Sequence, residues 1–242
     1  MTDTATQQNS PGADSISVFF PCYNEQDNIR RVYESASKVL GKTGVDYQLI
    51  WVDDGSTDQT PHIVNAIAAV DPRVTVVRHP ANLGYGKALQ SGIRAATKTL
   101  VFYTDGDGQF DLNELPPLLP LMKHYDIVSC FRLDRQDGLI RKFNAWCWTW
   151  FVCLLFRMKV KDINCAFKLY KRRIFDNLEL RSTGALINAE ILARATRRGY
   201  AIVQVGVRHF PRTSGQPTGA KPGVIFRAFW ELVKLYRQIN SE

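Results

Sequence analysis

The stretch YQLIWVDDGSTD, residues 47–58, joins an apolar run to an acidic loop and decides the fold. Its first six residues are mostly β-branched or aromatic, which predicts a buried strand. The loop after this strand carries three acids, and a helical pattern begins after Asp58. A strand that passes through a polar loop into a helix is the repeating unit of α/β proteins with parallel sheets.

The same unit recurs along the chain. Further strands are predicted at 15–20, 74–79, 99–104 and 126–131, and helices at about 28–40, at about 86–97 and in LNELPPLLPLM (112–122). This alternation predicts an α/β fold, with a mainly parallel sheet and helices on both faces. Ligands of such sheets bind beyond the carboxyl ends of the strands. The first four predicted strands each end in a polar loop, so the site is expected there.

Length and composition indicate one globular domain with appendages, since the chain has 242 residues and is 45% hydrophobic. Residues 1–14 have neither a basic start nor an apolar core, so they are predicted to be a disordered tail and not a signal peptide. No apolar run approaches the roughly 20 residues that cross a bilayer. The five cysteines include no CxxC pair, which favours a reduced, cytosolic setting.

Two carboxylates lie one residue apart in VFYTDGDGQF (101–110), a spacing that suggests a metal site. A calcium loop of the EF-hand type needs glycine at its sixth position and glutamate at its twelfth. Those positions hold Phe110 and Pro116, and the preceding run is predicted to be a strand where an EF-hand has a helix. The EF-hand interpretation is therefore rejected.

The nearby stretch GYGKAL (84–89) matches neither common nucleotide-binding motif. The dinucleotide fingerprint needs a third glycine where this chain has Leu89. A phosphate-binding P-loop needs glycine at Ala81 and serine or threonine at Ala88. Both motifs are rejected.

Four motifs together resemble the family-2 glycosyltransferases of the GT-A fold: PCYNEQDNI (21–29), VDDGSTDQT (52–60), NLGYGKALQSGIRAA (82–96) and TDGDGQFDLNELP (104–116). The closest resemblance is to polyprenyl-phosphate sugar synthases of the dolichol-phosphate mannosyltransferase type. It is collinear over roughly residues 15–220. We accordingly expect a GT-A domain at 15–222 and a C-terminal amphipathic helix at 223–242.

The resemblance implies a nucleotide-sugar donor, UDP- or GDP-linked, in the first four loops. Asp54 would accept a hydrogen bond from the base edge, which suits uracil and guanine alike. The implied nucleotide-binding residues are Pro21, Tyr23, Asn24, Glu25, Asp53, Asp54, Asn82, Lys87 and Asp105. Asp58 is expected only to cap the following helix.

The resemblance also implies that Mg²⁺ or Mn²⁺ is held by Asp105, Asp107 and Gln109. Oxygen ligands suit either ion, and both ions keep open positions for phosphate oxygens. As a Lewis acid, such an ion would neutralise the charge that grows on a departing nucleoside diphosphate. Asp107 is therefore counted among the catalytic residues.

The implied reaction is an inverting transfer of one sugar to a polyprenyl phosphate. The acceptor phosphate is already ionised at neutral pH, so it needs a cationic cradle more than a general base. Arg132, Arg212 and Lys221 are the candidates for this cradle. If the acceptor is instead a hydroxyl, Asp134 and Glu190 are candidate bases.

A membrane surface is the expected location. The segment 138–162 contains an apolar, aromatic block at 145–156, which spans about 18 Å as a helix and is too short to cross a bilayer. Cations flank the block on both sides, as in a helix that lies among anionic headgroups. The alternatives are a buried helix and the face of a homo-oligomer. Attachment at the cytoplasmic face of a membrane would be peripheral or through a membrane-anchoring partner protein.

Other activities fit less well. The net charge of +8 predicts anionic partners, but a nucleic-acid binder would not explain the paired acids, so no nucleic acid is predicted. A nucleotidyltransferase would carry a glycine-rich, basic loop on its first strand, and PCYNEQ lacks one. The nearest alternative is a family-2 transferase that acts on a sugar or another hydroxyl. A membrane scaffold with a decayed site is disfavoured because the four donor motifs are intact.

Overall fold

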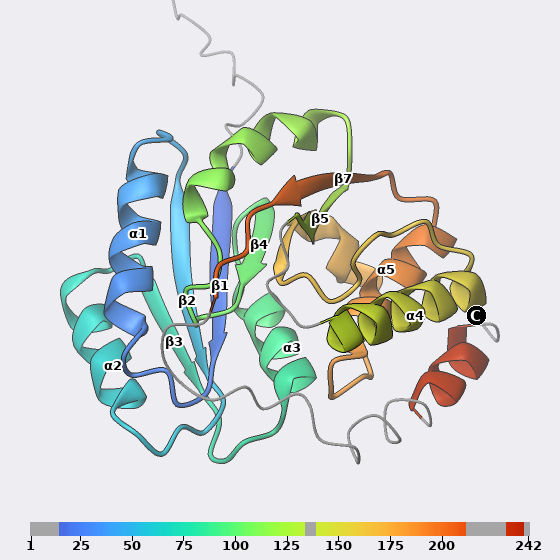
Figure 1. Ribbon diagram of the computed structural model, residues 1–242. Coiled ribbons are helices and arrows are strands. Elements are labelled where there is room, and N and C mark those ends of the chain that lie inside the picture. The colour runs from blue at the N-terminus through green and yellow to red at the C-terminus, as the bar shows by residue number, and fades with distance from the viewer. Residues whose placement is uncertain (1–14, 134–138, 212–230, 240–242) are drawn as a thin grey trace, which may run out of the picture.

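The computed structural model of the protein describes residues 15–133, 139–211 and 231–239. Within them, seven strands form one sheet in the order β3-β2-β1-β4-β6-β5-β7 (Figure 1). The strands are β1 (Ile16–Cys22), β2 (Tyr47–Asp53), β3 (Val74–Arg78), β4 (Leu100–Thr104), β5 (Ile127–Arg132), β6 (Phe167–Lys171) and β7 (Ile202–Val207). β6 runs antiparallel to both neighbours and the other pairings are parallel. The predicted mainly parallel α/β fold is confirmed.

Helices cover both faces of the sheet (Figure 1). They are α1 (Ile29–Gly41), α2 (Thr60–Val70), α3 (Tyr85–Ala95), α4 (Leu139–Phe156), α5 (Ile187–Arg197) and the helix 231–239. Alternate residues of β1 separate the two cores, because Val18 and Phe20 pack with α1 and α2 whereas Phe19 packs with α3 and α5. The neighbouring strands β2 and β4 divide their side chains between the two cores in the same way. The helices thus cover the faces of the sheet, and the loops lie at its carboxyl edge.

The helix predicted at 112–122 is present, but it is not an α-helix. It forms two 3₁₀ segments, η1 (Leu112–Glu114) and η2 (Pro116–Lys123). Three prolines, at 116, 117 and 120, explain the difference, because proline has no N–H for an α-helical hydrogen bond and its ring clashes with the preceding turn.

Strands β6 and β7 were not predicted from the sequence. β6 has the sequence FKLYK and contains a fully buried lysine, Lys168. Its ammonium group donates hydrogen bonds to the carbonyls of Ile163, at 2.9 Å, and of Cys165. Burial lowers the pKa of Lys168. Lys168 interrupts the apolar run of this five-residue strand, which is the pattern by which the other strands were predicted.

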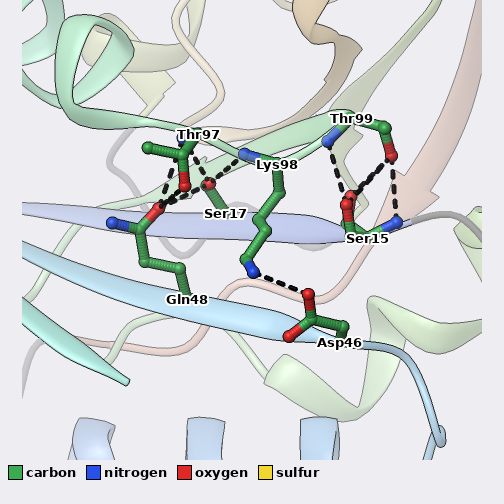
Figure 2. Close-up of polar contacts among 7 residues, drawn as sticks. All are labelled: Ser15, Ser17, Asp46, Gln48, Thr97, Lys98 and Thr99. Carbon is green, nitrogen blue, oxygen red and sulfur yellow. Dashed lines mark hydrogen bonds and ion pairs between the residues drawn. The ribbon is translucent and has the colours of Figure 1, made fainter. Parts of the chain in front are cut away.

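Side chains close the edge of the sheet that lies opposite the polar loops. Ser17 Oγ accepts hydrogen bonds from the amides of Thr97 and Lys98, both at 3.1 Å, and donates one to Gln48 (Figure 2). Ser15 and Thr99 exchange further hydrogen bonds beside them. These contacts tie the connection between α3 and β4 to the starts of β1 and β2.

Helix α4 begins at Leu139, six residues before the predicted apolar block. Val152 is buried against the core, whereas Trp146, Trp150 and Leu154 are exposed by 62%, 56% and 63%. Phe156 lies 6.1 Å from the ring of Tyr236 in the helix 231–239. No helix in the described part of the chain is long and apolar enough to cross a membrane.

Candidate functional site

The loop after β1 is tied to the loop after β2. Asn24 adopts a left-handed backbone conformation, with φ at 55°, which asparagine tolerates better than most residues. Its amide donates to Ser56 Oγ at 2.9 Å, and its side-chain oxygen accepts from the amide of Thr57 at 2.8 Å. Glu25 is buried, and its amide donates to Thr60 Oγ1 at 2.9 Å. The first two predicted motifs therefore form one unit.

Other predicted residues of the first loop differ in their exposure. Pro21 is a buried residue of β1, and its carbonyl accepts a 3.3 Å hydrogen bond from the amide of Gly106. Tyr23 is 37% exposed, so its ring is open to a ligand. The first loop therefore also touches the loop that carries the paired acids.

The two acids after β2 are buried and hold backbone. Asp53 accepts from the amide of Ser56 at 2.9 Å, and its second oxygen lies 3.4 Å from Nε of Arg78. Asp54 accepts from the amides of Leu83 and Gly84, both at 2.9 Å. Asp54 thus fixes the third loop, a contact that the motif alone did not predict.

Asp58 lies one residue before the N-cap of α2, which is Gln59, so it is not the helix cap that was predicted. Its carboxylate accepts from the amide of Thr60, the first residue of α2, at 2.9 Å. It also accepts from the amide of Gln26 at 3.2 Å. The acid is therefore a structural residue that adds another link between the first two loops.

The third loop is confined from both sides. Gly84 has φ at 96°, a conformation that favours glycine, and it precedes the first turn of α3. The amide of Gly86 donates to the carbonyl of Thr183 at 2.8 Å, and a Cβ at Gly86 would lie 2.5 Å from the Thr183 backbone. Asn82 is exposed and Lys87 is half-buried in the first turn of α3. The loop therefore has little room to move.

The paired acids lie in the loop after β4. Asp105 accepts a 3.2 Å hydrogen bond from the hydroxyl of Tyr85, which links it to the third loop. Asp107 is buried and accepts from the amide of Gln109 at 3.0 Å. Burial, followed by the charge of Asp107, raises the pKa of Asp105 to about 7. A cation between the two carboxylates would relieve this repulsion.

The guanidinium group of Arg31 in α1 packs against the same loop. Gly108 has φ at 71°, and a Cβ there would lie 2.3 Å from Nη2 of Arg31. Arg31 donates to Asn28 at 3.1 Å and reaches the carbonyl of Asp107 at 3.5 Å, while Asn28 donates to Glu25 at 2.7 Å. The first and fourth loops are therefore connected through α1.

The predicted metal ligands fit a small divalent cation. Asp105, Asp107 and Gln109 offer three hard oxygen donors from one short loop, the ligand type that Mg²⁺ and Mn²⁺ prefer. Among the residues that the structure describes, no group of three or more histidine, cysteine or acidic side chains is placed to hold a metal. The fit therefore rests on the carboxylate pair and on the amide oxygen of Gln109.

The late part of the chain reaches the same loop. The side-chain amide of Gln109 donates to the backbone carbonyl of Phe210 at 2.9 Å, and the backbone amide of Phe210 donates to the backbone carbonyl of Gln109 at 2.8 Å. Phe110 pairs with His209 in an antiparallel bridge, and their ring centroids lie 4.9 Å apart. A segment about 100 residues further along the chain thus lies against the paired acids.

The predicted acceptor cations are only partly placed. Arg132 forms a bidentate ion pair with Asp162, with distances of 2.7 and 3.0 Å, and the Arg132 side chain is 14% exposed. Arg212, Lys221 and Asp134 lie outside the described residues. Arg132 remains a candidate, but its carboxylate partner was not predicted.

Glu190 does not fit the role of a base that it was given for a hydroxyl acceptor. It is fully buried in α5. It accepts from the amides of Arg181 and Ser182 and pairs with Nε of Arg194 at 3.0 Å. A carboxylate held in this way has no access to an acceptor, so we interpret Glu190 as the residue that holds the loop beside Gly86.

Several residues of the site lie outside the predicted motifs or had no role in them: Arg31, His79, Tyr85, Asp162, Lys168 and Asn188. Each makes contacts to residues distant in the chain or to backbone groups, and such contacts leave no local pattern.

The fold and the site define an α/β protein of the GT-A type, with paired acids at the carboxyl edge of its sheet. Residues 17–179 match the family described as glycosyl transferase family 2. The chain therefore belongs to glycosyl transferase family 2, as the four motifs predicted.

Two curated relatives of the chain are about 30% identical to it. The chain is 30% identical over 171 residues to a dodecaprenyl-phosphate galacturonate synthase of Rhizobium johnstonii, which covers 68% of this chain and 50% of the relative. It is 29% identical over 207 residues to an undecaprenyl-phosphate 4-deoxy-4-formamido-L-arabinose transferase of Pectobacterium atrosepticum, covering 83% and 61%. The chain thus spans one half to about three fifths of the length of these relatives.

A solved structure shares the fold. Glucosyl-3-phosphoglycerate synthase from Mycobacterium tuberculosis, in complex with Mn²⁺, UDP and glucosyl-3-phosphoglycerate, superposes with a TM-score of 0.64 at 22% identity. The match covers 93% of this chain and 77% of that one. At this identity the likeness establishes the GT-A fold.

Proposed function

We propose that the protein transfers one sugar, with inversion, from a UDP- or GDP-sugar to a polyprenyl phosphate. The observation that carries this proposal is the meeting of four donor loops and one late segment around Asp105 and Asp107. Two relatives in the same family are named for transfer to, or synthesis on, a polyprenyl phosphate. Their names support the class of acceptor.

The donor half binds the nucleotide and its diphosphate. Asp54 keeps acceptor capacity for a base N–H, and Tyr23 offers an exposed ring beside it. Asp105, Asp107 and Gln109 would hold Mg²⁺ or Mn²⁺, which when bound neutralises charge on the diphosphate. Tyr85 orients Asp105 through its hydroxyl group. Asn82 and Lys87 belong to the loop that closes this side of the site.

The acceptor half binds a phosphate that is already ionised. Asp162 fixes the plane of the Arg132 guanidinium, and a fixed guanidinium can present a pair of N–H groups to phosphate oxygens. Phe210, tied to Gln109, leads directly to the stretch that contains Arg212 and Lys221. We assign these two cations to the same cradle.

The reaction needs positioning more than proton transfer. An oxygen of the acceptor phosphate forms a bond to the anomeric carbon as the bond from that carbon to the donor diphosphate breaks. The nucleoside diphosphate leaves with the electron pair, and attack from the opposite side inverts the configuration. Because the attacking oxygen is an anion, no side chain has to remove a proton.

A hydroxyl acceptor is the nearest alternative. It would need a base, and the buried, fully engaged Glu190 does not supply one. Asp134, the other candidate base, lies outside the described residues, so the preference for a polyprenyl phosphate rests on the names of the two relatives.

We also propose that α4 rests on an anionic membrane surface. Trp146, Trp150 and Leu154 recur every four residues and are exposed, so they form one apolar stripe. Arg157, Lys159 and Lys161 follow the helix and are exposed. Aromatic side chains beside cations suit the headgroup region, where the lipid acceptor would be met at the cytoplasmic face. The same geometry places Trp148 partly against the core, so it is not a docking residue.

A thermal-shift panel tests the donor assignment. Binding to the folded state raises the melting temperature by mass action. UDP, GDP and their sugar conjugates are compared with Mn²⁺ and with EDTA. A shift with one nucleotide that EDTA removes supports the proposal, and the absence of a shift with every nucleotide at millimolar concentration contradicts it.

A further inference from the structure

His79 follows β3 directly and is buried beside the nucleotide loops. Its Nδ1 lies 2.7 Å from Oδ1 of Asp54, and its Nε2 lies 2.9 Å from Oγ of Ser91 in α3. Its backbone amide also donates to the carbonyl of Asp53 at 2.9 Å. Main chain and both ring nitrogens therefore hold the imidazole in one orientation.

The chemistry of the partners assigns the direction of these hydrogen bonds. A carboxylate only accepts, so Nδ1 of His79 carries the proton that it donates to Asp54. Ser91 Oγ accepts from Nη2 of Arg94 at 3.4 Å, which leaves its hydroxyl hydrogen for Nε2 of His79. A chain of donors thus runs from α3 through His79 to Asp54.

Asp54 is therefore almost completely committed. Its Oδ1 accepts from His79 and from the amide of Leu83, and its Oδ2 accepts from the amide of Gly84. A carboxylate oxygen has about two lone-pair sites, so Oδ1 is filled and one site remains on Oδ2. Asp54 can therefore accept one further hydrogen bond, and it can do so only at Oδ2.

We propose that His79 is a positioning residue for nucleotide recognition, which orients Asp54 so that Oδ2 alone accepts the N–H of the donor base. The inference rests on the proposed function. Uracil and guanine both present such a ring N–H, so the chemical class of ligand is a nucleotide whose base carries one. His79 itself does not touch the nucleotide, and Ser91 supports it from α3.

Loss of His79 should have two separable effects. Without ligand, His79 keeps Asp54 on the amides of Leu83 and Gly84, so its loss should loosen the third loop. With ligand, the loss of His79 should weaken the hydrogen bond from the base N–H to Asp54, and it should leave the binding of the diphosphate and of the metal unchanged. A purely structural histidine would produce the first effect without the second.

The experiment compares His79→Phe with His79→Asn, whose amide nitrogen can replace Nδ1. Ser91→Ala is a milder variant that keeps the imidazole, and His62→Phe, at an exposed histidine of α2, is the matched control. Hydrogen exchange of the Leu83 and Gly84 amides is measured without nucleotide. Binding of Mn²⁺ with UDP, GDP, N3-methyl-UDP or N1-methyl-GDP is then measured by calorimetry, together with binding of Mn²⁺ alone.

We expect His79→Phe to speed exchange of the two amides at least tenfold, and His79→Asn and Ser91→Ala to do so less. Wild type should bind the unmethylated nucleotide about tenfold more tightly than its N-methyl analogue, a difference of about 1.4 kcal/mol. His79→Phe should lose most of this discrimination, and His79→Asn should restore part of it. Binding of Mn²⁺ alone should not change, and His62→Phe should match wild type.

Unchanged exchange of the two amides in His79→Phe would overturn the positioning claim whatever the ligand data show. Faster exchange with the N-methyl discrimination intact would show a structural histidine and would also overturn the inference. If wild type binds neither UDP nor GDP, the proposed function is wrong, and so is the role of His79 in nucleotide recognition. In that case the exchange data still decide whether His79 orders the loop.

Discussion

The side-chain amide of Gln109 donates to the carbonyl of Phe210 at 2.9 Å, across 101 residues of chain. This hydrogen bond joins the loop of the paired acids to the segment that precedes the predicted acceptor cations. One residue therefore has two expected tasks, because its nitrogen ties the late segment and its oxygen is a predicted metal ligand. The two tasks can be separated by substitution.

Gln109→Glu keeps oxygen ligands but cannot donate to Phe210. We expect Mn²⁺ to bind Gln109→Glu as tightly as wild type or more tightly. The KM for polyprenyl phosphate should rise several-fold, since a hydrogen bond contributes about 0.5–1.5 kcal/mol. Gln48→Glu removes similar side-chain amide contacts, to Thr75 at 3.1 Å and to the carbonyl of Ala95 at 3.5 Å, at the opposite edge of the sheet and should leave both values unchanged. Loss of Mn²⁺ binding with an unchanged acceptor KM would contradict the division of tasks.

Asp105 should make the metal-free protein less stable as the pH rises. Its folded-state pKa of about 7 lies above the ordinary value of 3.8, so the folded state binds the proton more tightly than the unfolded state. The contribution to stability is therefore fully present below about pH 4 and is lost as the pH rises through about 7. Denaturation of metal-free protein between pH 5 and pH 8, against Asp105→Asn, isolates this contribution.

Mn²⁺ should also displace this proton, because the carboxylate must be ionised to bind a metal. Calorimetry near pH 6.5 in buffers of different ionisation enthalpy should show proton release on binding. The release should be smaller in Asp107→Asn, in which the charge that raises the pKa of Asp105 is absent. Binding without proton release at this pH would contradict the role of Asp105 as a ligand.

Arg132→Lys keeps the positive charge but cannot form the bidentate pair with Asp162. We expect the KM for polyprenyl phosphate to rise about tenfold and the affinity for the donor nucleotide to stay within twofold, a split of about 1.4 kcal/mol that separates the two halves of the site. The matched control is Arg172→Lys, whose exposed pair with Asp176 lies away from the loops and contributes little to stability. Equal losses of donor and acceptor binding in Arg132→Lys would refute the acceptor assignment.

The loops of the donor half could be predicted from the sequence, and the reasons are physical. Strands β1 to β4 are apolar runs with polar residues at their carboxyl ends, which a local pattern reveals. β6 could not be found in this way, because Lys168 is buried by carbonyls that come from outside the strand. The helix predicted at 112–122 is of the 3₁₀ type, since its three prolines are incompatible with α-helical hydrogen bonding.

The site shows the same limit. Motifs predicted Asp54 and Gln109 but not the partners that fix them, His79 and Phe210, which lie 25 and 101 residues away in the chain. Contacts of this length depend on the tertiary fold. The motif residues themselves stay predictions until binding is measured.

Replacing Trp146 and Trp150 by serine tests the membrane surface. Both side chains are more than half exposed, so the folded protein should lose little stability. Pelleting with vesicles of anionic lipid should fall several-fold, whereas turnover of a short, water-soluble polyprenyl phosphate should be kept. Val152→Ser is the contrasting variant, because Val152 is fully buried and its loss should lower stability instead. Undiminished pelleting of a folded double variant would refute the interfacial role of α4.

Direct detection of the product tests the central claim. Purified protein is incubated with Mn²⁺, the nucleotide-sugar selected by thermal shift and a polyprenyl phosphate, and the lipid fraction is analysed by mass spectrometry. The account predicts a polyprenyl-phosphate-sugar whose anomeric configuration is opposite to that of the donor, abolished by EDTA and by Asp107→Ala. Sugar found only on a hydroxyl acceptor, or lipid product formed equally well by Asp107→Ala with EDTA, would contradict it.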